Sequence, residues 1–201
     1  MISLEKDGGL WVATINRPDK ANSLTAEMLE QLCEIAEDAR ESRVLVLTGI
    51  GKVFSAGADL DAARAGLATS PLWERLSGAI ARLDALTICA ANGTVAGGAM
   101  GMFLACDLRI AAPGAKVFYP VMKLGFLPQP SDPKRLSALV GTSRAKMILM
   151  AGQKIPVEDA LDWGLINQIV EGDVVDAAKE LAQDTAGASP EHATAIKRLI
   201  G

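Results

Sequence analysis

Two short glycine-containing turns, each placed directly after an apolar run, constrain this chain more than any other feature of its sequence. The first turn spans residues 53–59 (VFSAGAD) and the second spans residues 92–101 (NGTVAGGAMG). Each is expected to lead from a strand into a helix, because Asp59 is a natural helix N-cap and an apolar segment follows the second turn. Since the first N–H groups of a helix have no partner within it, two such turns can direct two N–H donors at one oxygen atom.

Strands and helices are predicted to alternate along the chain. A hairpin over residues 2–16 turns at Gly8 and Gly9, because a glycine pair fits a tight turn. Further strands are expected at residues 44–48, 87–91, 108–111 and 166–170. Helices are expected at residues 25–40, 73–83, 102–106, 133–150, 157–163, 174–186 and 190–200. Such alternation predicts an α/β fold with a parallel sheet.

The composition is typical of a globular protein and excludes several other classes. Half of the 201 residues are hydrophobic and 22% are charged, so a single domain over residues 1–201 can bury most of its apolar surface. The net charge of −4 offers no basic surface, so nucleic acid is not an expected partner. No membrane span is expected, because polar residues and glycines interrupt the apolar stretch over residues 86–105.

The three cysteines, Cys33, Cys89 and Cys106, are odd in number, widely spaced and set in apolar runs. This pattern fits neither a disulfide framework nor a zinc site, so no metal is expected. We therefore expect buried thiols and a cytoplasmic protein.

Five segments resemble, in order and spacing, the motifs of the crotonase superfamily, also called the enoyl-CoA hydratase/isomerase family. They are residues 16–24, 54–60, 92–107, 123–128 and 160–166. The resemblance implies a superhelical core of ββα units with parallel sheets, together with its flanking helices, over residues 1–187. It also implies a C-terminal helix over residues 188–201 that is shorter than in most members, which would leave the acyl pocket more open. Members assemble into trimers or dimers of trimers, so the same is expected here.

The resemblance implies a backbone oxyanion hole made by the N–H groups of Ala58 and Gly98. These donors would bind the carbonyl oxygen of a CoA thioester and stabilise the enolate formed when the neighbouring carbon loses or gains a proton. The CoA thioester would be the substrate, and no further cofactor is expected. Either turn alone favours simple close packing of a helix on a strand, but the pairing of the two turns within the wider pattern favours the catalytic interpretation.

Coenzyme A would contact two segments that match the family's pattern. Lys20 and Ala21 belong to the first segment, and Ala56 and Leu60 flank the expected adenine pocket in the second. Many members carry a lysine just after this turn, where the present chain has Asp61, whose charge would repel the nucleotide's phosphate. Lys20 is also consistent with an ordinary solvated loop lysine.

The chain lacks both glutamates with which hydratases of the family position a water molecule. Gly101 stands at the first glutamate position, and Val121, which would only line the substrate pocket, stands at the second. Neither residue can transfer a proton. Isomerase chemistry, or a related lyase or hydrolase step, is therefore favoured over two-glutamate hydration. A catalytically inactive acyl-CoA-binding protein is the alternative, and a purely structural subunit is a third interpretation.

A loop near the expected acyl pocket offers replacements for the missing glutamates. Asp132 is the candidate base, and Gln129 is a candidate hydrogen-bond donor. Ser131 or Asp132 could instead cap a helix that starts at Pro133. Tyr119 would border the substrate, where it could donate a proton to an enolate or simply fill the core, and the core interpretation is favoured.

Overall fold

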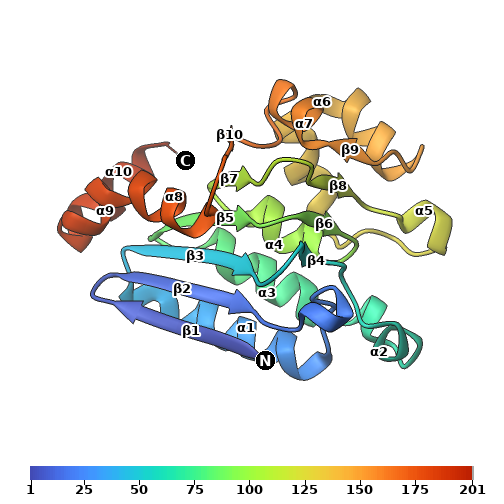
Figure 1. The fold of residues 1–201 in the computed structure, drawn as a ribbon, viewed down its shortest axis with the longest axis horizontal. Coiled ribbons are helices and arrows are strands. Elements are labelled where there is room, and N and C mark those ends of the chain that lie inside the picture. The colour runs from blue at the N-terminus through green and yellow to red at the C-terminus, as the bar shows by residue number, and fades with distance from the viewer. Residues whose placement is uncertain (201) are drawn as a thin grey trace.

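Two sheets of unequal size form the centre of the structure, a computed structural model that describes residues 1–200 (Figure 1). The larger sheet has the strand order β1-β2-β3-β5-β7-β10, and the smaller has the order β4-β6-β8-β9. The strands of the larger sheet are β1 (Ile2–Asp7), β2 (Leu10–Ile15), β3 (Val44–Gly49), β5 (Leu86–Ala91), β7 (Leu108–Ala111) and β10 (Gln168–Ile169). Those of the smaller sheet are β4 (Val53–Ser55), β6 (Thr94–Ala96), β8 (Lys116–Phe118) and β9 (Ile155–Pro156).

Three consecutive ββα units build most of both sheets. Each unit sends its first strand to the larger sheet and its second strand to the smaller one, and a helical segment follows. The first strands β3, β5 and β7 pair in parallel, and so do the second strands β4, β6 and β8. The helices after the units are α2 (Leu60–Arg64), α3 (Leu72–Ala81), α4 (Ala99–Ala105), α5 (Val121–Leu124) and α6 (Asp132–Leu149). The repeated ββα core implied by the resemblance is thus confirmed.

The first strands enter the larger sheet as the predicted hairpin. Strands β1 and β2 pair antiparallel, from Ile2 opposite Ile15 to Asp7 opposite Leu10, and β2 then pairs in parallel with β3. Helix α1 (Ala26–Asp38) connects β2 to β3, and the side chain of its N-cap Thr25 accepts a hydrogen bond from the Met28 N–H. Three short 3-10 helices complete this half of the chain: η1 (Pro18–Lys20), η2 (Ala39–Glu41) and η3 (Leu67–Thr69).

Both faces of the larger sheet are buried, which explains why its central strands are continuous apolar runs. Successive residues of a strand point to opposite faces. Leu45 and Leu47 of β3 join a core cluster with residues of α1, α3 and α4. Val44 and Val46 join a second cluster beneath α8 (Val174–Leu181), which covers the other face (Figure 1). The sheet is therefore held between two helical layers, and its strand ends are fixed in position.

Several predicted element boundaries are wrong. Helix α6 is not the single regular helix expected over residues 133–150, because Gly141 has a φ of 79° and a ψ of 163° that interrupt it. The helix expected over 174–186 divides at Ala182 into α8 and α9 (Gln183–Gly187). Of the strand expected over 166–170, only β10 forms. Glycine adopts positive φ without a steric penalty, so the Gly141 interruption is local in origin.

The remaining helices, α7 (Val157–Asp162) and α10 (Pro190–Ile200), match their predictions. Among residues 1–200, no helix combines the length and the apolar character required to cross a membrane. Cys33, Cys89 and Cys106 are buried free thiols, as expected. Burial raises the pKa of Cys106 to about 12, so this thiol is unreactive near neutral pH.

Candidate active site

The two glycine turns predicted from the sequence lie against each other at the ends of β4 and β6. These strands pair in parallel, so their carboxyl ends meet at one edge of the smaller sheet. Gly57, in the first turn, has a φ of +88°, and a Cβ atom here would lie 2.9 Å from both the Gly98 nitrogen and the Ala96 carbonyl oxygen. Glycine is required at this position because the two main chains touch there.

Replacing Gly57 by alanine should destabilise the protein and push the two turns apart. A left-handed backbone costs a non-glycine residue about 1–2 kcal/mol, and the overlap with Gly98 adds to that cost. Gly66 is a matched control, because its φ is +106° and nothing lies within 4 Å of an added Cβ. Urea unfolding of both alanine variants separates the two effects. Equal losses of stability would show that contact between the turns is unimportant.

Two main-chain donors are unused at this contact. Within the part of the chain that the structure describes, residues 1–200, neither the Ala58 nor the Gly98 N–H group donates a hydrogen bond. The backbone around Ala58 is nevertheless fixed, since the Leu24 N–H donates to the Gly57 carbonyl (2.8 Å) and the Asp59 N–H donates to the Leu24 carbonyl (2.9 Å). Gly98 occupies the N-cap position of α4. Both donors are therefore free and are carried on ordered backbone.

A cavity of ≈ 160 Å³ is lined by both donor residues. Seven of the residues predicted from the sequence share its wall: Ala56, Ala58, Leu60, Gly98, Tyr119, Val121 and Gln129. Most of the remaining wall is apolar, with contributions from α3, α5 and the loop that follows α5. A larger cavity of ≈ 530 Å³ lies under α10 and includes His192, but it contains none of the predicted site residues. The sequence motifs therefore converge on the smaller cavity.

Trp73 closes one side of this cavity and packs against the second turn. Its indole Nε1 donates a hydrogen bond to the Leu67 carbonyl at 2.7 Å. Atoms of its ring would lie 2.8–2.9 Å from a Cβ atom added at Gly98, so a side chain at position 98 would collide with the indole. The second turn thus needs glycine for a contact made by a distant helix.

The segment predicted to bind coenzyme A lies alongside the first turn. The Ala56 N–H donates to the Ala21 carbonyl at 3.0 Å. Asn22 is buried and holds this segment against β4, because its Nδ2 donates a hydrogen bond to the Val53 carbonyl at 2.7 Å. Lys20 is exposed, and neither Lys20 nor Ala21 lines the cavity. These two residues are therefore placed beside the site and not within its wall.

The charged residues after the first turn are paired. The Asp59 carboxylate accepts hydrogen bonds from the Asp61 and Ala62 N–H groups, which confirms it as the N-cap of α2. Arg17 lies 2.8 Å from Asp59 and holds the pKa of that carboxyl below its usual value. Asp61 is exposed and lies 3.4 Å from Arg64, which partly offsets the charge expected to repel a phosphate.

Gly101 and Val121, which stand at the two glutamate positions, have different surroundings. Val121 is buried and lines the cavity, as predicted. Gly101 is a buried residue of α4, and a Cβ atom there would lie 3.4 Å from Asp132 Oδ1 and 3.5 Å from Asp132 Oδ2. The carboxylate of Asp132 therefore approaches, from α6, the space into which a side chain at position 101 would extend.

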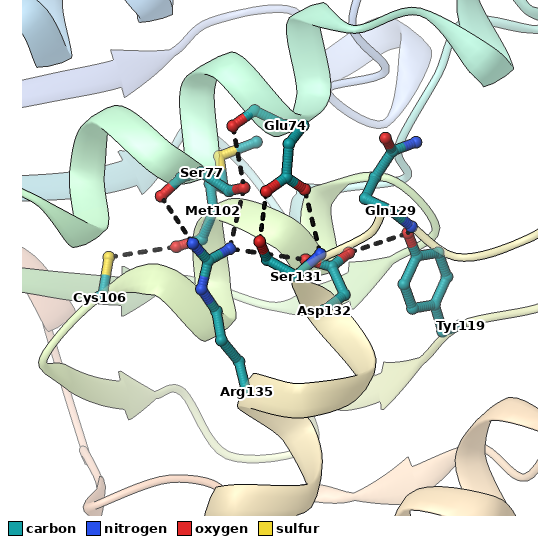
Figure 2. A network of polar contacts seen from close by, with 9 residues as sticks. All are labelled: Glu74, Ser77, Met102, Cys106, Tyr119, Gln129, Ser131, Asp132 and Arg135. Atoms are coloured by element: carbon teal, nitrogen blue, oxygen red, sulfur yellow. Dashed lines mark hydrogen bonds and ion pairs between the residues drawn. The ribbon is translucent and has the colours of Figure 1, made fainter.

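Asp132 and Tyr119 form the polar centre of the site (Figure 2). Asp132 is fully buried, and its Oδ2 accepts a hydrogen bond from the Tyr119 hydroxyl at 3.0 Å. The same hydroxyl accepts a hydrogen bond from the Gln129 main-chain N–H at 3.3 Å. Gln129, predicted to donate a hydrogen bond in the acyl pocket, lines the cavity; within this network only its main chain takes part, and its amide group points away from Tyr119 (Figure 2).

Ser131 occupies the N-cap position of α6, as one alternative predicted, but its side chain makes no capping hydrogen bond, and Asp132 does not cap the helix. The Ser131 hydroxyl and N–H group instead donate to the two carboxylate oxygens of Glu74, which reaches across from α3. Asp132 is itself the first residue of α6 and is directed at Tyr119. Its burial is therefore not explained by a role in starting the helix.

Burial raises the pKa of Asp132 to about 6. The Glu74 carboxylate raises this pKa as well, whereas the hydrogen bond from Tyr119 and the charge of Arg135 lower it. Burial and the neighbouring carboxylates also raise the pKa of Tyr119 above its usual value. Near neutral pH, therefore, Tyr119 stays protonated while Asp132 is mostly ionised, and Asp132 reaches its midpoint near pH 6.

Sequence reasoning missed Glu74 and Arg135. Arg135 lies 3.9 Å from Asp132 Oδ1 and donates a hydrogen bond to the Ser77 hydroxyl at 2.9 Å. Both residues act across the contact between α3 and α6, so their roles depend on tertiary packing. No local motif in the sequence marks either residue.

The chain also matches known proteins. A family model described as enoyl-CoA hydratase/isomerase matches residues 5–200. The short-chain-enoyl-CoA hydratase of Clostridium acetobutylicum is 34% identical over 213 residues, which cover 99% of this chain and 80% of that protein. The 1,2-epoxyphenylacetyl-CoA isomerase of Escherichia coli is 33% identical over 191 residues, which cover 89% of this chain and 73% of the isomerase.

Solved structures share the same fold. The enoyl-CoA hydratase of Bacillus anthracis has a TM-score of 0.90 at 31% identity, with 99% of this chain and 81% of that chain covered. The Pseudomonas aeruginosa protein DspI has a TM-score of 0.90 at 34% identity, with 99% and 79% covered. The two-sheet arrangement of ββα units is therefore the crotonase fold. The chain belongs to the enoyl-CoA hydratase/isomerase family, also known as the crotonase superfamily.

Proposed function

We propose that this protein binds an acyl-CoA thioester and stabilises its enolate with the main-chain N–H groups of Ala58 and Gly98. One observation carries the proposal: two free N–H donors on touching turns line a single, mostly apolar cavity. A developing enolate oxygen needs two fixed donors in a place from which water is largely excluded. The names of the relatives, a short-chain-enoyl-CoA hydratase and a 1,2-epoxyphenylacetyl-CoA isomerase, agree with an acyl-CoA substrate.

Isomerisation, or a related lyase or hydrolase step, fits the site better than two-glutamate hydration. Gly101 and Val121 leave both usual positions without a carboxylate. Asp132, at the start of α6, supplies a single carboxylate, which lies next to Gly101. One group that takes up a proton and returns it is sufficient for an isomerase, whereas positioning a water molecule between two carboxylates requires a second such group.

The coenzyme A portion would lie over the joined segments that contain Lys20 and Ala21 on one side and Ala56 and Leu60 on the other. Leu60 is 76% exposed at the rim of the cavity, so its side chain is available to an adenine ring. The thioester would then reach the two N–H donors from the side of the first turn. We propose no further cofactor, and we assign the protein to the cytoplasm.

A combined binding and turnover measurement tests this function. Crotonyl-CoA, a 3-enoyl-CoA and several saturated acyl-CoAs would each be titrated into the purified protein, with the heat of binding and the product mass both recorded. Conversion of a 2-enoyl or 3-enoyl ester is the expected result. If no ester binds, the assignment to acyl-CoA chemistry is wrong.

A catalytically inactive acyl-CoA-binding protein is the second candidate. The absence of a carboxylate at both Gly101 and Val121 favours it. Under this alternative, the same titrations would show binding of several esters without any product.

We also propose that the protein assembles into trimers or dimers of trimers, as its family membership implies. The expected result is a sedimentation coefficient that corresponds to at least three chains at micromolar concentration. A stable monomer under these conditions would contradict the proposal.

A further inference from the structure

Among residues 1–200, Tyr119 is the only titratable residue in the wall of the site cavity. The other lining residues are apolar, are glycines or, like Gln129, carry an amide that does not titrate. Asp132 is not part of the wall but lies directly behind Tyr119, with its Oδ2 at 3.0 Å from the tyrosine hydroxyl. Tyr119 thus lies between Asp132 and the cavity, so a proton from Asp132 would reach a group bound there through the tyrosine hydroxyl.

The hydrogen bonds around this hydroxyl allow two arrangements. When Asp132 is ionised it can only accept, so it takes the single proton of Tyr119, and the hydroxyl oxygen also receives the Gln129 N–H. A second lone pair of that oxygen then remains for the cavity. When Asp132 is protonated, its carboxyl can donate to the tyrosine oxygen, which frees the tyrosine proton to point into the cavity. The pair thus has a base form and an acid form.

Asp132 is well placed to change between these forms. Its Oδ1 is buried and has no hydrogen-bond partner among the described residues, which makes the ionised form costly. The charged groups around it are Glu74 of α3 and Arg135 of α6, the latter 3.9 Å away, while α4 contributes only Gly101. Glu74 raises the pKa of Asp132 and Arg135 lowers it. Because these two effects oppose each other, burial has the largest influence on that pKa.

We propose that Tyr119 and Asp132 form a proton relay, in which Tyr119 exchanges the proton with the acyl group and Asp132 stores it. This inference rests on the proposed function. In the forward step the bond between the α-carbon and its hydrogen breaks, and that proton bonds to the Tyr119 oxygen. The tyrosine's own proton passes to Asp132 Oδ2, and the electron pair of the broken bond forms the enolate. Tyr119 therefore never becomes a free phenolate, which its raised pKa would disfavour.

The reverse step delivers the stored proton. Asp132 returns its proton to the tyrosine oxygen while the tyrosine hydroxyl protonates the enolate. Protonation at the α-carbon gives no net reaction, and it gives hydrogen exchange only where the proton held by Tyr119 and Asp132 has first been replaced from the solvent. Protonation at the γ-carbon of a dienolate converts a 3-enoyl ester into a 2-enoyl ester. Both outcomes restore the Asp132 carboxylate, so the relay needs no other reactant. Tyr119 is then the catalytic residue and Asp132 is a positioning and proton-storing residue.

Exchange of α-protons in D₂O tests the relay without requiring the natural substrate. Butyryl-CoA would be incubated with the full protein, and deuterium uptake at the α-carbon would be followed by mass. The wild-type rate is expected to rise with pH through about 6, because the base form requires ionised Asp132. Tyr119→Phe keeps the aromatic ring and should lower the rate by at least about 10², with little change in the Kd for butyryl-CoA.

Two further variants separate a relay from a packing role. Asp132→Asn can still accept a hydrogen bond from Tyr119 but cannot store a proton, so exchange should fall to a low residual rate that no longer changes with pH through about 6. Glu74→Gln removes a charge that raises the pKa of Asp132, so the midpoint of the pH profile should move to lower pH. If Asp132 served only to pack the core, Glu74→Gln would leave the midpoint of the exchange profile unchanged.

The possible failures are distinguishable. Exchange that persists in Tyr119→Phe would overturn the relay alone and leave the enolate proposal standing. If the wild-type protein neither exchanges the α-protons of butyryl-CoA nor converts a 3-enoyl ester into a 2-enoyl ester, both proposals are wrong, whether or not butyryl-CoA binds.

Discussion

Gly98→Pro is expected to lower kcat for an accepted acyl-CoA by about 10²–10³ relative to Gly98→Ala, with little change in Kd. Proline lacks the N–H group that we propose as an oxyanion donor, whereas alanine retains it. The Gly98 φ of −59° is compatible with a proline ring. Both replacements add a Cβ atom that would lie within 2.9 Å of the Trp73 ring, so they share this steric cost. The ratio of the two rates therefore reports the replacement of the N–H hydrogen by a ring carbon, with the Cβ cost cancelled.

The collision with Trp73 determines how this comparison should be carried out. Each change at position 98 would be made both in the wild-type background and in Trp73→Leu, which relieves the overlap. Thermal unfolding of all the variants would establish that they fold. Steady-state kinetics and calorimetric titration would then give kcat and Kd. If the proline and alanine variants turned over equally in the Trp73→Leu background, Gly98 would not be an oxyanion donor.

The donor pair was predictable from the sequence because each part of it is local. Each turn is recognisable from an apolar strand followed by glycine, and parallel pairing then brings the ends of β4 and β6 together. Most of the ββα order could be anticipated in the same way. The interruption of α6 at Gly141 could not, since an isolated glycine within a helical pattern is usually tolerated.

The acid/base centre was only partly predictable, for a physical reason. Asp132 was identified as a candidate because it lies in a loop that the resemblance places near the acyl pocket. Its burial, its distance from Gly101 and its partnership with Tyr119 all depend on how α6 packs against α4 and α3. Side-chain contacts between elements distant in sequence leave no local pattern. The sequence favours a core role for Tyr119, and the residue is indeed buried in the core with its hydroxyl hydrogen-bonded, but it also lines the cavity, which no local pattern indicates.

The free energy of unfolding of Asp132→Asn, relative to that of the wild-type protein, is expected to increase as the pH rises from 4 to 7.5. Burial raises the pKa of this carboxyl from 3.8 to about 6 in the folded protein. A raised pKa means that the folded state favours the protonated form. The stabilising contribution of that form is complete below about pH 4 and is lost as the pH rises through 6. A shift of about two units corresponds to a cost of about 3 kcal/mol at pH 7.5, and asparagine, which does not titrate, avoids it.

The quantity to measure is the free energy of unfolding of the variant minus that of the wild type, obtained by urea denaturation at several pH values. This difference should grow by about 2 kcal/mol between pH 4 and pH 7.5. A constant offset from packing the asparagine amide does not affect this slope, and the other titrating groups cancel between the two proteins. A flat difference would show that Asp132 titrates as an ordinary carboxyl. Since the same variant should lose α-proton exchange, a positive slope would show that this carboxylate is destabilising at the pH where the relay requires it, as expected for a residue retained for function.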